Sequence, residues 1–167
     1  MKTTRREHLA LLGSAVAAAG AGAPLAALAD GHAQTIEVQM LNKHPDDSKE
    51  RMVFVPAVIR ANPGDTIKFV SADKGHNSES TKGMLPEGAE EWKSKINDDF
   101  ELTVTVDGTY GFNCTPHKTV GMVGLILVGD AMVNFEEAKG VRQRGKAKAR
   151  YEEAFAQAEE MLAAESS

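Results

Sequence analysis

Residues 113–122 carry three side chains that can bind a soft metal ion within one short segment. Cys114 offers a thiolate, His117 an imidazole three residues later, and Met122 a thioether five residues after that histidine. A loop of this length can fold around one ion and present all three groups. Sulfur ligands combined with imidazole favour copper, and blue-copper sites use two histidines, one cysteine and a weak axial methionine. The loop therefore predicts a copper centre that still needs a second histidine.

The second histidine has to come from elsewhere in the chain. His76 follows a strand-like run at 66–70 and is the best candidate. Taken alone, His76 could be an ordinary loop histidine, and Cys114 a small buried apolar residue. Taken together in one exported β-protein, they predict two ligands of the same ion. The weaker candidates lie near the N-terminus or in a polar turn: His8, His32 and His44.

The first 29 residues predict an export signal. Arg5 and Arg6 precede a weakly apolar stretch, 9–28, which ends in the small-x-small pattern Ala27-Leu28-Ala29. Paired arginines suggest the twin-arginine route, and a membrane anchor is the alternative. Export makes the single cysteine informative, because a lone thiol in an oxidising compartment is a liability unless it is buried, paired with another chain or bound to a metal ion.

Composition limits the classes of function. The chain has 167 residues, 42% of them hydrophobic, which suits one domain with an appendage and is too short for a multicopper oxidase. The formal charge is −5, and removing the leader with its three basic and one acidic side chains leaves −7. Such an acidic protein is a poor nucleic-acid binder. The chain also lacks a block of Lys and Arg residues of the kind that would predict a membrane-surface helix.

The middle of the chain reads as a β-sandwich. Short runs of alternating or β-branched residues are separated by turn signals, among them 62–65 (Asn-Pro-Gly-Asp). Asp107-Gly108 predicts a tight turn that joins its flanking strands as a hairpin. The predicted strands are 34–40, 52–60 with a break at Pro56, 66–70, 102–106, 109–112 and 124–128.

Two segments depart from the strand pattern. Residues 86–95 predict a short helix or an irregular loop. After residue 129 an amphipathic helix is expected, with Tyr151, Phe155, Ala158 and Leu162 on one face, and Asn134 is a candidate cap of a shorter helix before it. These helices would cover the sandwich or bind a partner. The predicted parts are a leader at 1–29, a β-sandwich at 30–129 and a helical extension at 130–167.

The order of these motifs resembles the pseudoazurin family of type 1 blue-copper proteins. The matching pieces are 61–66, 74–77, 86–90 and the run 114–122, Cys-Thr-Pro-His-x4-Met. The resemblance implies a mainly β, cupredoxin-like Greek-key sandwich with two C-terminal helices. It also implies one copper ion, Cu(I)/Cu(II), held in the periplasm by His76, Cys114, His117 and Met122. Its usual partners are redox proteins such as nitrite reductase and cytochromes.

Around the ligands the sequence suggests supporting roles. Asn77 has an amide that could tie the His76 segment to the Cys114 loop, or it is a simple turn residue. Pro116 has no N–H to donate to the thiolate, and Thr115 places a hydroxyl beside it. The resemblance implies that His117 reaches the surface through an apolar patch, with lysines around it that steer an acidic partner. Candidates for this partner surface are Lys74, Lys118, Met52, Met84, Pro86 and Pro116, although the lysines could also be scattered surface charges.

The function predicted is a diffusible, monomeric electron carrier. A periplasmic copper-delivery protein is the alternative, but such proteins hold copper in exposed sites rich in methionine or histidine. We expect no enzymatic activity, because four protein ligands leave no open position at the metal.

Overall fold

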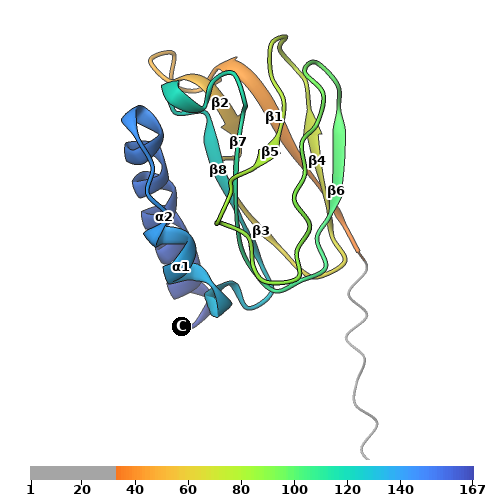
Figure 1. The fold of residues 1–167 in the computed structure, drawn as a ribbon, viewed down its shortest axis with the longest axis vertical. Helices are drawn as coiled ribbons and strands as arrows, with labels where there is room; N and C mark the ends of the chain where they lie inside the picture. The colour runs from red at the N-terminus through yellow and green to blue at the C-terminus, as the bar shows by residue number, and fades with distance from the viewer. Residues whose placement is uncertain (1–32) are drawn as a thin grey trace, which may run out of the picture. The chain divides into compact units, whose positions relative to one another are not determined.

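The computed structural model describes residues 33–167 as a two-sheet sandwich with helices on one side (Figure 1). One sheet has the strand order β2-β1-β4-β6 and the other β3-β8-β7-β5. The strands are β1 (Thr35–Lys43), β2 (Arg51–Val55), β3 (Val58–Ala61), β4 (Thr66–Val70), β5 (Glu79–Ser80), β6 (Phe100–Thr103), β7 (Gly108–Asn113) and β8 (Val123–Val128). The helices are α1 (Phe135–Gly140) and α2 (Gly145–Glu165), with 3₁₀ turns η1 (Lys118–Val120) and η2 (Ala131–Val133).

The first sheet follows from the period-two pattern of its strands. Val38 and Met40 of β1 are fully buried, while their neighbours on the strand are more exposed. β1 pairs antiparallel with β2 and parallel with β4, which sets Met40 opposite Phe54 and Val38 opposite Phe69. Side chains of alternate residues share one face of a sheet, so these four apolar residues point into the space between the sheets. The predicted sandwich is confirmed.

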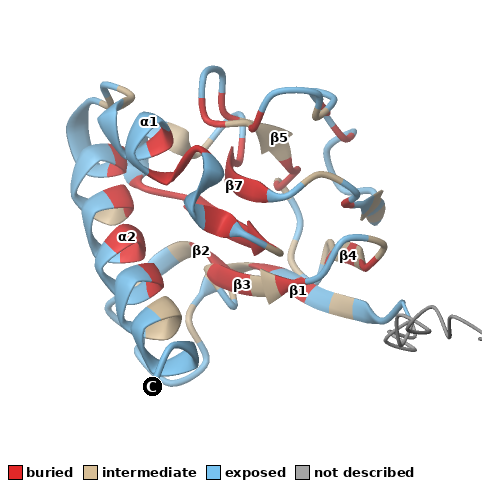
Figure 2. Ribbon diagram, turned by 90° about the horizontal axis from the view of Figure 1, so that it is seen from below, coloured by how far each residue is buried: buried red, intermediate tan, exposed pale blue. Residues whose placement is uncertain are grey.

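The second sheet is buried on both faces. In β8, Ile126 and Val128 belong to the core between the sheets, whereas Leu125 and Leu127 belong to a second core beneath the helices. The apolar face of α2 completes that second core with Tyr151, Phe155 and Ala158. Figure 2 shows the buried stripe of α2 turned toward the sheet. The helices therefore cover the sandwich, as one of the two interpretations predicted.

The predicted hairpin around Asp107-Gly108 is wrong. The strand before it, β6, pairs with β4 in the first sheet, and the strand after it, β7, pairs with β8 and β5 in the second. The turn therefore carries the chain from one sheet to the other. Gly108 is required there, because a Cβ would lie 2.6 Å from the Pro86 ring in a backbone conformation with φ of 139°.

Two smaller predictions are resolved by contacts far apart in the sequence. Residues 86–95 form no regular helix; they run as a loop that Trp92 anchors by donating its indole N–H to the Ser78 hydroxyl. The side chain of Asn134 does not cap α1. It accepts a hydrogen bond from the Thr109 N–H and donates one to the Thr109 carbonyl, and so ties the start of the helical extension to β7.

The predicted export signal, residues 1–29, lies outside the described residues. Within 33–167, no helix combines the length and the apolar character needed to cross a membrane.

Candidate metal centre

The loop between β7 and β8 folds back on itself through its own backbone. The Cys114 N–H donates to the Met122 carbonyl at 3.0 Å, and the Met122 N–H donates to the His117 carbonyl at 3.1 Å. The His117 N–H in turn donates to the Cys114 carbonyl at 3.1 Å. Gly121 closes the loop at φ of 97°, where a Cβ would lie 2.8 Å from the Arg150 side chain on α2. These bonds bring three predicted ligands to one end of the sandwich.

His76 arrives at the same place from the loop after β4. Its Nδ1 lies 3.1 Å from His117 Nδ1 and 3.9 Å from Cys114 Sγ, and the Cys114 Sγ lies 3.5 Å from His117 Nδ1. A point equidistant from these three atoms is about 2 Å from each, close to the metal–ligand bond lengths of about 2.0–2.3 Å for nitrogen and sulfur donors. The three side chains therefore fit one ion between them. Among the described residues, they form the only such cluster of histidine, cysteine or acidic groups, and His44 is not part of it.

Burial separates the four ligands into two kinds. His76, Cys114 and Met122 are completely buried, whereas His117 is partly exposed. Burial, and after it the neighbouring His117, lower the pKa of His76, so that its imidazole is neutral at pH 7. Burial raises the pKa of the Cys114 thiol, although backbone N–H groups of Asn77 and His117 act in the opposite direction. A bound cation would offset that penalty by stabilising the thiolate.

Asn42 orients His76, a role that no motif in the sequence indicated. The His76 Nε2 lies 3.1 Å from the Asn42 side-chain oxygen. An amide oxygen can only accept, so Nε2 carries the proton and Nδ1 presents its lone pair to the metal position. Asn42 lies on β1, 34 residues before His76 in the chain, and the parallel alignment of β1 with β4 brings the two residues together.

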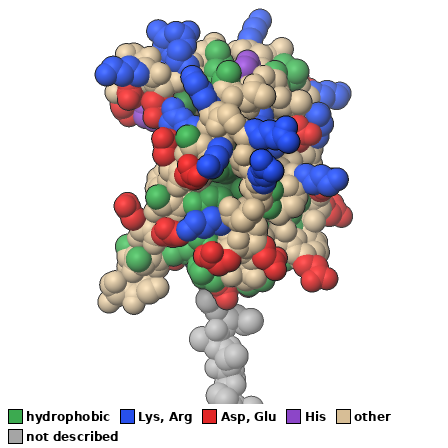
Figure 3. Space-filling model, turned by 60° about the vertical axis from the view of Figure 1, so that its left-hand side comes forward, with side chains coloured by type: hydrophobic (Ala, Val, Ile, Leu, Met, Phe, Trp, Pro, Cys, Tyr) green, Lys and Arg blue, Asp and Glu red, His purple; other side chains and the backbone are tan. Residues whose placement is uncertain are grey.

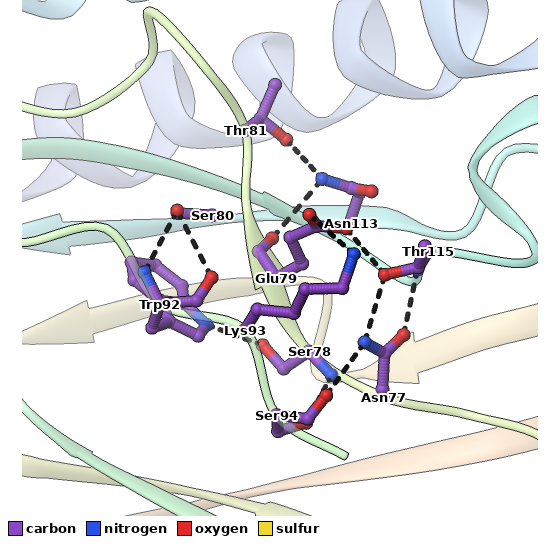
Figure 4. Close-up of polar contacts among 10 residues, drawn as sticks. All are labelled: Asn77, Ser78, Glu79, Ser80, Thr81, Trp92, Lys93, Ser94, Asn113 and Thr115. Carbon is purple, nitrogen blue, oxygen red and sulfur yellow. Dashed lines mark hydrogen bonds and ion pairs between the residues drawn. The ribbon is translucent and has the colours of Figure 1, made fainter. Parts of the chain in front are cut away.

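Asn77 joins the two ligand segments. Its side-chain oxygen accepts from the Thr115 N–H at 2.8 Å, and its amide group donates to the Thr115 hydroxyl and to the Ser94 carbonyl (Figure 4). The Thr115 hydroxyl donates to the carboxylate of Glu79, a residue that sequence reasoning did not single out. The residue after His76 is thus fastened to the residue after Cys114. Such outer contacts hold the ligands in a fixed geometry.

The exposed side of His117 opens into a shallow groove of about 370 Å³. Met52 and Val120 supply its apolar part, and Val120 is 45% exposed. Pro116 is also exposed beside His117. Cations from three elements line the rest of the groove: Lys49, Arg51, Lys146 and Arg150.

The predicted partner surface has to be corrected at two positions. Met84 is fully buried in the core beneath the helices, where its sulfur accepts a hydrogen bond from the Gln143 amide. Pro86 is buried and packs against the turn at Gly108. Neither side chain can therefore form a contact surface for a partner. Lys74 is exposed and Lys118 is half-buried, so both cations are available on the surface.

Comparisons with known proteins agree with this geometry. Residues 39–129 match the family of copper-binding proteins described as plastocyanin/azurin. A pseudoazurin of Paracoccus pantotrophus is 52% identical over 140 residues, covering 84% of this chain and 94% of the relative. A pseudoazurin of Methylorubrum extorquens is 41% identical over 142 residues, covering 85% and 94%. A solved pseudoazurin structure from Sinorhizobium has 49% identity and a TM-score of 0.72, covering 75% of this chain and 97% of its own.

Proposed function

Because the chain belongs to the pseudoazurins, within the copper-binding plastocyanin/azurin family, we propose that it is a diffusible periplasmic electron carrier. Its copper site is of type 1, formed by His76, Cys114, His117 and Met122. The proposed acceptor is a redox enzyme such as the nitrite reductase of denitrification. The observation that carries the proposal is that His117 is the one partly exposed ligand in a site that is otherwise buried.

The residues around the site suit electron transfer and leave no place for a substrate. A bound copper ion supplies a one-electron couple between Cu(I) and Cu(II). His76, Cys114 and Met122 are shielded from water, which keeps small molecules away from the metal position. The Asn77 and Thr115 contacts hold the two ligand segments together, so that the same geometry can serve both oxidation states. The partly exposed His117 is the shortest route from the ligands to a partner.

Burial also argues against the alternative of copper delivery. A delivery protein has to release its ion to another protein, which favours ligands that a partner can reach. Here the thiolate lies at 0% exposure beneath a loop closed by three backbone hydrogen bonds.

The charge distribution supports an acidic partner despite the net negative charge. The groove beside His117 carries Lys49, Arg51 and Lys146, with Lys74 and Lys118 on the same end of the sandwich. On the face that includes the helices, Lys and Arg side chains gather toward this end, and Asp and Glu toward the other (Figure 3). A local positive field of this kind raises the rate of encounter with an acidic surface.

Two measurements test the proposal. The copper-loaded protein should show an intense visible thiolate-to-Cu(II) band that bleaches on reduction. In stopped-flow mixing, the reduced protein should transfer its electron to a purified copper nitrite reductase, faster at low salt than at high salt. A colourless Cu(II) form would refute the type 1 site, and a coloured protein that no redox enzyme oxidises would refute the carrier role.

Periplasmic location and the monomeric state are part of the same proposal. The leader predicted at residues 1–29 supports export. N-terminal sequencing of the protein from a periplasmic fraction should begin at Asp30, and sedimentation should give the mass of a monomer. If the protein is found in the cytoplasm with residues 1–29 still attached, the proposed periplasmic location is wrong.

A further inference from the structure

Glu79 places a carboxylate one hydrogen bond away from the ligand loop. It is the first residue of β5, and its backbone is fixed by pairing with Asn113 and by a bridge to Lys93. Its Oε2 accepts a hydrogen bond from the hydroxyl of Thr115, the residue that follows the Cys114 ligand (Figure 4). Its Oε1 forms an ion pair of 3.0 Å with Lys93. The carboxylate is thus held between the copper loop and a surface lysine.

The direction of the Thr115 hydroxyl is determined by its other partner. The Asn77 amide N–H donates to the Thr115 oxygen at 2.9 Å. A hydroxyl has one proton, so Thr115 has only that proton to give, and it donates it to Glu79. The hydrogen bonds therefore run in one direction, from Asn77 through Thr115 to the Glu79 carboxylate. Charge on that carboxylate keeps the whole series aligned beside Cys114.

Glu79 is ionised at neutral pH. Partial burial alone would raise the pKa of its carboxyl group, but hydrogen bonds from Thr115 and Lys93, with the charges of Lys93 and Lys118, lower it overall. The negative charge acts on the ligand as well. A Glu79 oxygen accepts from the hydroxyl of Thr115, the residue bonded directly to Cys114, so the charge lies close to the thiolate.

We propose that Glu79 is a tuning residue that lowers the midpoint potential of the copper site, and that Lys93 moderates its effect. The inference rests on the proposed function as a copper electron carrier. Cu(II) carries one more positive charge than Cu(I), so a fixed negative charge beside the thiolate stabilises the oxidised state more. Lys93 offsets part of that charge.

The arrangement has a consequence for the encounter with a partner. Lys93 is 57% exposed at the side chain and Glu79 only 28%, so an acidic partner can reach the lysine without reaching the carboxylate. A partner that takes Lys93 into its own ion pair leaves Glu79 less compensated. The potential then falls further, and the reduced carrier gives up its electron more readily while it is docked.

Voltammetry on the copper-loaded protein tests the proposal. Glu79→Gln removes the charge and keeps an acceptor for the Thr115 hydroxyl, so the midpoint potential should rise. The equilibrium constant for reduction of the copper site should increase at least threefold, which corresponds to about 28 mV at 59 mV per tenfold change. Lys93→Gln should shift the potential in the opposite direction and by less, because its side chain is more exposed to solvent and salt.

Glu160→Gln is the matched control, because it removes the same charge from an exposed position near the end of α2. It should leave the potential within error. Visible spectra and urea unfolding of the metal-free variants separate tuning from a fold defect. If Glu79→Gln keeps the visible band and its potential stays level or falls, the proposal is wrong, while the carrier function stands.

Lys93→Gln keeps the proposal testable if Glu79→Gln fails to fold. It leaves the ligand loop untouched, and at low salt its potential must drop. An unchanged potential at low salt would overturn the tuning role. By contrast, if the copper-loaded protein without substitutions shows no visible band, the proposed function itself is wrong.

Discussion

Asn77 should stabilise both the fold and the copper site, and Asn77→Ala measures the two effects together. The residue is 1% exposed, and its side chain makes three hydrogen bonds, two with Thr115 and one with the Ser94 carbonyl. Each such bond contributes about 1 kcal/mol net, and partners left unsatisfied in a buried place add to the loss. We therefore expect a loss of about 3 kcal/mol in the free energy of unfolding. For a domain of this size, that corresponds to a fall of about 10 °C in Tm.

The assay is urea unfolding of the metal-free protein, followed by the visible spectrum of the copper-loaded protein. Asn134→Ala is the matched control, because Asn134 is also buried and makes two hydrogen bonds with the Thr109 backbone, away from the ligands. It should cost about 2 kcal/mol and leave the spectrum unchanged. Asn77→Ala should in addition shift or broaden the visible band. A loss below about 1 kcal/mol with an unaltered spectrum would refute the argument that Asn77 fastens the two ligand segments.

Four further substitutions address the ligands and the surface. Cys114→Ser should abolish the visible band, because a hydroxyl is a far weaker donor to copper; a native spectrum would refute the ligand assignment. Met122→Gln introduces a harder donor that favours Cu(II), so voltammetry should show a potential lower by ~59 mV, which corresponds to a tenfold smaller equilibrium constant for reduction. An equal or higher potential would exclude Met122 as axial ligand. Lys74→Glu should slow stopped-flow electron transfer to nitrite reductase severalfold at low salt and hardly at high salt, and rates insensitive to both would contradict steering. Pro116→Ala adds an N–H that can withdraw density from the Cys114 sulfur, so the potential should rise by a similar ~59 mV; a crystal structure with that N–H on the sulfur and no rise would disprove the reasoning.

The ligands were predictable because most of the site is local in sequence. Cys114, His117 and Met122 lie within nine residues, and their chemistry alone favours one metal. His76 could be added because few histidines remained once the loop was set aside. The strand pattern gave the sandwich for a similar reason, since alternation along one strand reports which side chains are buried.

Partners across the sheets were not predictable from the same patterns. Alternation says that residues 102–106 and 109–112 are strands, but not that they join different sheets. Met84 and Pro86 look like surface residues of a loop, and only the packing of the helices and of the Gly108 turn buries them. Asn42 acts on His76 through the β1–β4 alignment. Each of these errors concerns a contact between segments far apart in the chain.

The helical extension offered two interpretations, a cover for the sheet or a partner-binding element, and the structure confirms the cover. The buried face of α2 packs on β8 through Tyr151 and Phe155. Its first two turns, however, reach the ligand end of the sandwich, where Lys146 and Arg150 line the groove beside His117. Arg150 is held there by an ion pair of 2.7 Å with Glu50 in the loop between β1 and β2. The packing that covers the second sheet thus also fixes the position of two cations next to the exposed ligand, because Lys146 and Arg150 belong to the same helix as the buried Tyr151 and Phe155.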